Sequence, residues 1–308
     1  IIGQFNRMYF KKSLAVPLAP YAIKAAQIQP LKPTDLPALQ LNVEDLRVAN
    51  FSLGRTEFIS VPSAAGLQIK KFSTKSPLLT SSMTGLWQGE GINERIALKA
   101  QIKSPDLGKL VSSLQIGDVI KHGELKADID IFWSGSPVDF NLQNISGVLD
   151  LDINEGQILN VDPGGGRVLG LFSLTEIPRR LSLDFSDFFG KGFAFKKITG
   201  RFNFGQGKIS SDNLFVAAPA ADLKISGSSD FVTRQYNQII NVYPKTSGIL
   251  PVIGALTAGP IGIAAGVVAQ AVFKKPISAS TELSYSITGP WSKPEVKKID
   301  SANRKDKK

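Results

Sequence analysis

Residues Gly123–Trp133, GELKADIDIFW, carry the pattern that decides the fold. Apolar and polar side chains alternate along this stretch, and successive side chains of a β-strand point to opposite faces of a sheet. One face holds Leu125, Ala127, Ile129, Ile131 and Trp133, and the other holds Glu124, Lys126, Asp128 and Asp130. The stretch therefore predicts a strand that is apolar on one face and charged on the other.

The same alternation recurs along the chain, and several of the alternating runs end at a glycine. Their apolar positions are Leu149, Leu151 and Ile153; Phe202 and Phe204; Leu223 and Ile225; and Leu283, Tyr285 and Ile287. Strand-like segments about ten residues apart also run from Leu39 to Lys103, as is typical of an all-β chain. Strands that are apolar on one face must turn those faces toward a common interior. The pattern leaves open whether a second sheet or another apolar body fills that interior.

A helix is expected to follow the first group of strands. Ser104 is a candidate N-cap, Pro105 suits the first helical position, and Asp106 suits the positive end of the helix dipole. The apolar positions at helical spacing are Leu107, Leu110, Val111 and Leu114. We expect the helix to end near Gly117 and to cover one edge of the sheet.

The segment Ile249–Phe273 has 25 residues and no charge. Pro251 and Pro260 interrupt it, so we expect two short helices, a broken apolar segment near the C-terminus. Its contact residues would be Ile249, Leu250, Val252, Ile253, Ile261, Ile263, Val267, Val268 and Phe273. Three roles stay open: a cap packed on the sheet, an interfacial contact with a membrane, or a membrane span.

The composition narrows the classes of protein. With 43% hydrophobic residues among 308, the chain can bury a large core. It has no cysteine, which excludes disulfides and thiolate metal sites. The formal net charge of +10 lies at the ends, with net +5 in residues 1–33 and net +4 in residues 293–308. The body shows no basic stripe, so we expect no nucleic-acid partner; the basic ends suit an anionic membrane surface or act as solubilising tails.

No set of residues assembles a catalytic constellation. The turn Gly164–Gly166 lacks the Lys-Ser/Thr pair of a phosphate loop, so a tight turn explains it better. His122 is the only histidine, which excludes a histidine-rich metal site, and we expect it on the surface. Two aspartate pairs, Asp128 with Asp130 and Asp150 with Asp152, lie on polar strand faces and are expected to be solvated. We predict no catalytic residue, no metal and no cofactor, and we do not expect an enzyme.

The stretch Val161–Gly207, VDPGGGRVLGLFSLTEIPRRLSLDFSDFFGKGFAFKKITGRFNFGQG, combines a glycine-rich turn, the pair Arg179-Arg180 and aromatic strand-like runs. Eight of the chain's eighteen phenylalanines lie between Phe172 and Phe204. The order of these pieces resembles the carboxy-terminal region of the YhdP branch of the AsmA-like, TamB-related envelope proteins. The ending ITGPW at Ile287–Trp291 is similar to that family as well.

This resemblance implies an elongated, curved antiparallel sheet that forms an open, taco-like groove with an apolar interior. It implies intermembrane phospholipid transport in the periplasm of a Gram-negative envelope, by an inner-membrane-anchored protein that reaches the outer membrane. Acyl chains would fill the groove, and the apolar strand positions given above, from Leu125 to Ile287, would line it. The partners implied are phospholipid, a membrane at one end and an envelope protein. Arg179 and Arg180 would meet the lipid head group or, alternatively, pair with Asp184 and Asp187.

The same strands also fit an alternative, a non-catalytic β-barrel or sandwich for envelope assembly or for docking a partner protein. Because no targeting signal follows Ile1, we expect the chain to be a fragment of a longer one whose signal lies upstream. The expected divisions are a linker (1–36), the β-groove (37–247), the apolar helical segment (248–275), a final strand (276–292) and a basic disordered tail (293–308).

Overall fold

The computed structural model describes residues 1–10, 32–159, 193–219, 221–245 and 282–299. These residues form one sheet of 14 strands, and the order of strands in the sheet follows their order in the sequence. The strands are β1 (Ile2–Phe10), β2 (Leu39–Val48), β3 (Phe51–Ser63), β4 (Gly66–Lys75), β5 (Thr80–Gln88), β6 (Arg95–Ser104), β7 (Ile120–Ser134), β8 (Ser146–Ile158), β9 (Phe193–Gly205), β10 (Lys208–Ala217), β11 (Ala221–Asp230), β12 (Gln235–Pro244), β13 (Leu283–Pro290) and β14 (Glu295–Ile299). The helices of the described part are α1 (Leu107–Ser113) and three 3-10 helices, η1 (Pro33–Asp35), η2 (Gly91–Asn93) and η3 (Pro137–Asp139).

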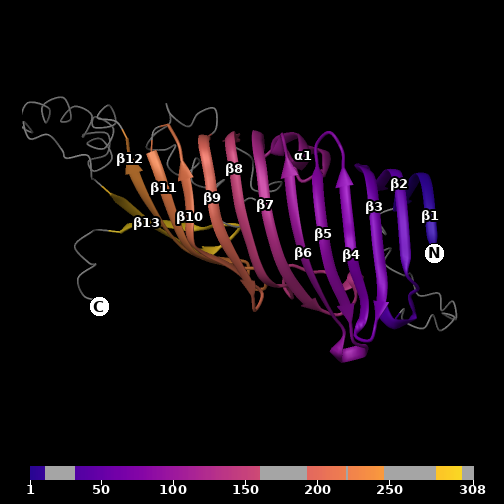
Figure 1. The fold of residues 1–308 in the computed structure, drawn as a ribbon. Coiled ribbons are helices and arrows are strands. Elements are labelled where there is room, and N and C mark those ends of the chain that lie inside the picture. The colour runs from indigo at the N-terminus through magenta and orange to yellow at the C-terminus, as the bar shows by residue number, and fades with distance from the viewer. Residues whose placement is uncertain (11–31, 160–192, 220, 246–281, 300–308) are drawn as a thin grey trace, which may run out of the picture.

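Neighbouring strands pair antiparallel, except that β1 and β2 run parallel. Strands β1 and β14 form the two edges, so the described sheet is open. Figure 1 shows the strands lying side by side along one long axis, each curving along its own length. The predicted mainly β, open and curved antiparallel sheet is confirmed. A closed barrel or sandwich, the alternative drawn from the sequence, is wrong for these strands.

Bulges and glycines bend the strands. Register shifts lie between Val43 and Leu46 in β2 and between Ile69 and Phe72 in β4, and a bulge increases the local bend and twist. Gly147 in β8 has a φ of 131°, and a Cβ there would collide with the backbone carbonyl oxygen of Asp130 in β7. Only glycine permits this close approach of two strands.

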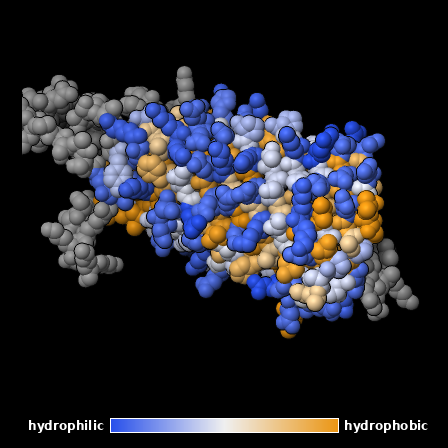
Figure 2. Space-filling view, in the orientation of Figure 1, coloured by the Kyte–Doolittle hydropathy of each residue, from blue (hydrophilic) through white to orange (hydrophobic). Residues whose placement is uncertain are grey.

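One face of the sheet is polar. Cross-strand ion pairs on this face join Glu44 to Arg55 (2.8 Å), Glu57 to Lys71 (2.6 Å), Asp130 to Lys99, Asp150 to Arg201 (2.7 Å) and Asp152 to Lys197 (3.0 Å). Opposite charges on adjacent strands favour one register. Because the pairs are solvent-exposed, each contributes about 1 kcal/mol or less. Figure 2 shows this face, on which hydrophilic residues predominate.

The other face is apolar and holds two clusters of buried side chains. The larger cluster joins α1 to the strands after it and includes Leu214 and Val216, whose side chains are fully buried. The smaller cluster contains Leu67, Trp87, Ile96, Trp133 and Ile145. The separation of a polar from an apolar face, predicted from Gly123–Trp133, therefore extends across the described sheet.

Several secondary-structure expectations are corrected. Residues 1–36, expected to be a linker, include β1 and η1, and the expected disordered tail includes β14. Strands β10 and β12 were not predicted. Helix α1 is capped by Asp106, whose Oδ1 accepts from the Lys109 backbone N–H at 3.0 Å, and not by Ser104. The helix ends at Ser113, earlier than Gly117.

Several expectations fall on residues outside the described ranges. These are the glycine-rich turn, the pair Arg179-Arg180 and the apolar segment Ile249–Phe273 with its contact residues. In the part of the chain that the structure describes, no helix has the length and apolar character needed to cross a membrane.

Candidate functional site

A row of partly exposed apolar side chains crosses seven neighbouring strands at mid-length. This floor row consists of Leu41, Phe58, Phe72, Met83, Ala100, Ile129 and Leu149, one from each of β2 to β8. Each member pairs directly with the next across the strands, so the row is straight in register. Every member is neither buried nor fully exposed. At about 4.8 Å between strands, the row is about 29 Å long.

On one side of the floor row lies the smaller buried cluster, here called the tryptophan wall (Leu67, Trp87, Ile96, Trp133 and Ile145). Trp87 Nε1 donates to Glu94 Oε1 at 2.7 Å, and Trp133 Nε1 donates to the Ser136 carbonyl oxygen at 3.0 Å. Both rings are therefore buried while both N–H groups stay satisfied. Trp133 follows Ile129 of the floor row by four residues, about 13 Å along β7.

On the other side lies the helix wall, formed by α1 and the strand positions beneath it. Its members are Leu107, Leu110, Val111, Leu125 and Ile153, all buried in one cluster. Burial by itself raises the pKa of the Asp106 carboxyl at the helix N-cap, but the hydrogen bonds and charge of Lys109 and the charge of His122 hold that pKa below its usual value. Asp106 Oδ2 also lies 4.0 Å from Nδ1 of His122 in β7, the strand against which α1 packs. The partly exposed floor row thus lies between two sets of buried side chains, and we refer to the floor row with its two walls as the trough.

The structure places all fifteen predicted lining residues on the apolar face, as the strand register shows. Six of them are partly exposed: Ile129, Ile131, Leu149, Leu151, Phe204 and Tyr285. The other nine are buried by protein: Leu125, Ala127, Trp133, Ile153, Phe202, Leu223, Ile225, Leu283 and Ile287. Of the six, Ile129 and Leu149 belong to the floor row, and the role of all fifteen residues in lipid contact stays a prediction.

Sequence reasoning missed the floor-row members from β2 to β6. The bulges in β2, β3 and β4 shift the apolar positions of these strands by a residue, so strict alternation fails there. Strands β5 and β6 pair without a register shift, so bulges do not account for Met83 and Ala100. Phe58 and Phe72 nevertheless face each other edge to face, with ring centroids 6.3 Å apart. A search for one apolar residue at the middle of each successive strand, which tolerates a shift of one residue at a bulge, would identify these floor-row members.

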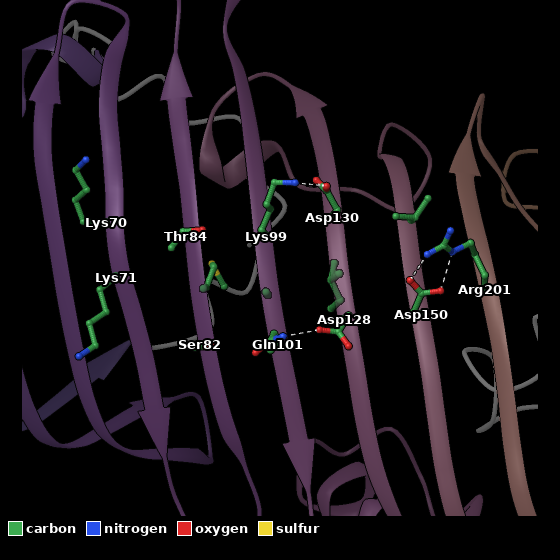
Figure 3. Close-up of a pocket in the computed structure, with 14 residues that line it drawn as sticks. Lys70, Lys71, Ser82, Thr84, Lys99, Gln101, Asp128, Asp130, Asp150 and Arg201 are labelled. Atoms are coloured by element: carbon green, nitrogen blue, oxygen red, sulfur yellow. Dashed lines mark hydrogen bonds and ion pairs between the residues drawn. The ribbon is translucent and has the colours of Figure 1, made fainter.

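The aspartates of the strands lie on the polar face, as expected, and His122 is exposed. Figure 3 shows the Asp150 carboxylate held by the guanidinium of Arg201, with both contacts at 2.7 Å. The hydrogen bond from Arg201 and, to a lesser extent, its charge hold the pKa of the Asp150 carboxyl below its usual value. These carboxylates are engaged in pairing neighbouring strands, on the side of the sheet opposite the floor row.

Comparisons with known proteins identify one family and one curated relative. The family model described as YhdP protein matches residues 1–296. The chain is 28% identical over 224 residues to the intermembrane phospholipid transporter YhdP of Escherichia coli (strain K12). That alignment covers 72% of this chain and 18% of the relative, so the chain spans less than a fifth of the relative's length. No solved structure matches the chain.

Proposed function

Because the chain belongs to the YhdP protein family, we propose that it carries phospholipid between membranes, with acyl chains lying along the floor row. The relative from Escherichia coli is named for this activity, which supports a transport role over a purely structural one. The floor row, the tryptophan wall and the helix wall together form the path of the lipid.

The observation that carries this proposal is the partial exposure of all seven floor-row side chains, which lie between the buried side chains of the tryptophan wall and those of the helix wall. Seven adjacent strands each present one apolar side chain to solvent at the same height. An acyl chain laid across them is stabilised by about 0.8 kcal/mol for each methylene removed from water. A row about 29 Å long therefore offers a continuous apolar path and not an isolated pocket.

We further propose that the chain works in the periplasm, as the C-terminal part of a longer bridge between the inner and outer membranes. The apolar segment Ile249–Phe273 would contact a membrane at one end of the path. Arg179 and Arg180 would meet lipid phosphate, since guanidinium groups bind phosphate in bidentate fashion. A protein of the envelope would complete the bridge. No step of this proposal uses a catalytic residue.

Site-specific photo-crosslinking tests the lipid path. A photoreactive amino acid is placed at Met83 or Ile129 in the floor row, and at Thr84 or Asp128 as matched controls. Each control is directly adjacent to its floor position in the same strand and points to the polar face. We expect phospholipid adducts from the two floor positions and not from the two controls.

Two outcomes count against the proposal. Equal labelling from both faces would mean that lipid meets the sheet without using the trough. Protein that purifies free of phospholipid, with no adduct from either floor position, would favour a role in docking a partner protein over a role in carrying lipid.

A further inference from the structure

The polar face carries a hollow of about 570 Å³ directly behind the floor row. Met83, Ala100 and Ile129 border it from the sheet, so the hollow and the lipid path lie back to back across a single layer of strands. Figure 3 shows the polar side chains around it, which come from β4 to β9. Those that the argument uses are Lys70, Lys71, Thr84, Gln101, Asp128 and Arg201.

Two lysines form one side of the hollow. The register shift in β4 places the consecutive residues Lys70 and Lys71 opposite the single residue Thr84, which makes a bulge. Lys71 pairs with Glu57 at 2.6 Å. Within the described ranges, Lys70 has no carboxylate at ion-pair distance, so this side of the hollow keeps an uncompensated positive charge.

Carboxylates form the other side. Asp128 and Asp150 are direct cross-strand partners in β7 and β8, an arrangement in which like charges repel. The guanidinium of Arg201 donates to both carboxylate oxygens of Asp150. Asp128 Oδ1 instead accepts a hydrogen bond from the neutral side-chain amide of Gln101, at 2.8 Å. Among the residues that the structure describes, Asp128 has no cation at ion-pair distance. A cation bound at Asp128 would offset the repulsion from Asp150.

We propose that this hollow binds a short extended peptide with a free amino group at Asp128 and a free carboxylate at Lys70. Lys70 lies three strands from Asp128 and, being opposite Thr84, two residues away from the level of Asp128 along the strands. Their Cα atoms are therefore about 16 Å apart, which an extended peptide of about five residues spans at 3.4 Å per residue. Ser82 and Thr84 lie between them and offer hydroxyl groups to the peptide backbone. The site would hold a peptide partner against the outside of the sheet while lipid occupies the other face.

A titration by NMR of the full chain, at low salt, uses penta-alanine with free ends, N-acetylated penta-alanine and C-amidated penta-alanine. Since exposed ion pairs contribute about 0.2–1 kcal/mol, we expect either modification to weaken binding by up to about fivefold. Lys70→Gln should abolish the effect of amidation alone, and Asp128→Asn the effect of acetylation alone. Lys121→Gln and Asp212→Asn, which change exposed charges elsewhere, should leave both effects intact.

The inference is overturned if the capped peptides bind as tightly as the free peptide. It is also overturned if both effects survive in Lys70→Gln and Asp128→Asn. Photo-crosslinking of phospholipid from Met83, repeated in these two variants, separates this inference from the lipid path. We expect lipid adducts to be unchanged, because the substituted side chains lie on the opposite face.

Discussion

A positive charge placed in the floor row should block lipid while leaving the fold intact. Ile129→Arg introduces the charge on the apolar face, and Val148→Arg introduces the same side chain on the polar face of the adjacent strand. Val148 pairs with Asp130, next to Ile129 in β7, so the two variants differ mainly in the face that they change. We expect Ile129→Arg to purify with far less phospholipid and Val148→Arg to purify with the normal amount.

The magnitude follows from the exposure of the site. If the new guanidinium displaces three methylenes of a bound chain, at about 0.8 kcal/mol each, the loss is about 2.4 kcal/mol, or roughly fiftyfold in occupancy. Because Ile129 is only partly buried, an arginine can lay its stem along the floor and keep its charge in water. The free energy of unfolding should therefore fall by less than about 1.5 kcal/mol.

The assay measures bound phospholipid by mass spectrometry and stability by urea unfolding on the same preparations. The reasoning is refuted if Ile129→Arg retains its lipid. It is equally refuted if Ile129→Arg fails to fold while Val148→Arg folds normally, because that result would place Ile129 in a closed core.

Three further predictions concern stability. Leu214→Ala, at a fully buried position, should lower the free energy of unfolding in urea by about 3 kcal/mol. Leu149→Ala in the floor row should lower it by less than half as much, because Leu149 is partly exposed. Equal losses would show that the floor row is part of the packed core. Asp106→Ala should cost about 1 kcal/mol by removing the cap of α1, and an unchanged midpoint would show that the cap does not stabilise the helix wall. Arg201→Gln should lower the free energy of unfolding slightly at neutral pH, because it removes the exposed cross-strand pair with Asp150. Because Arg201 lowers the pKa of Asp150 in the folded state, this difference should be fully present above the ordinary aspartate pKa of 3.8 and should vanish as pH falls through the lowered value. A difference that does not decline as the pH falls below 3.8 would assign the effect to packing.

The sequence predicts the faces of the strands well and their ends less well. Alternation in Gly123–Trp133 identifies one apolar and one charged face, because successive side chains of a strand always point to opposite faces of the sheet. The same reasoning fails for β10, where Ser211, Asp212 and Asn213 interrupt the pattern at a register shift. It also fails for β1, whose parallel pairing with β2 depends on residues far away in the sequence.

The candidate site was only partly predictable for a related reason. Ile129 and Leu149 were identified because β7 and β8 alternate strictly, whereas Phe58 and Phe72 were hidden by bulges in β3 and β4. The sequence also could not distinguish the partly exposed residues of the floor row from the buried residues of the two walls. Leu125 and Ile129 look alike in the pattern, yet Leu125 is buried among helix-wall residues and Ile129 stays partly exposed.

Quenching of tryptophan fluorescence tests the central claim directly. The chain has three tryptophans, so Trp291→Phe leaves only Trp87 and Trp133, both in the tryptophan wall. Phospholipid brominated on its acyl chains should quench this fluorescence, because bromine acts only at short range and the chains would lie beside the wall. Ile129→Arg should abolish the quenching and Val148→Arg should not. If phospholipid stays bound and the two tryptophans are not quenched, the acyl chains do not lie in the trough.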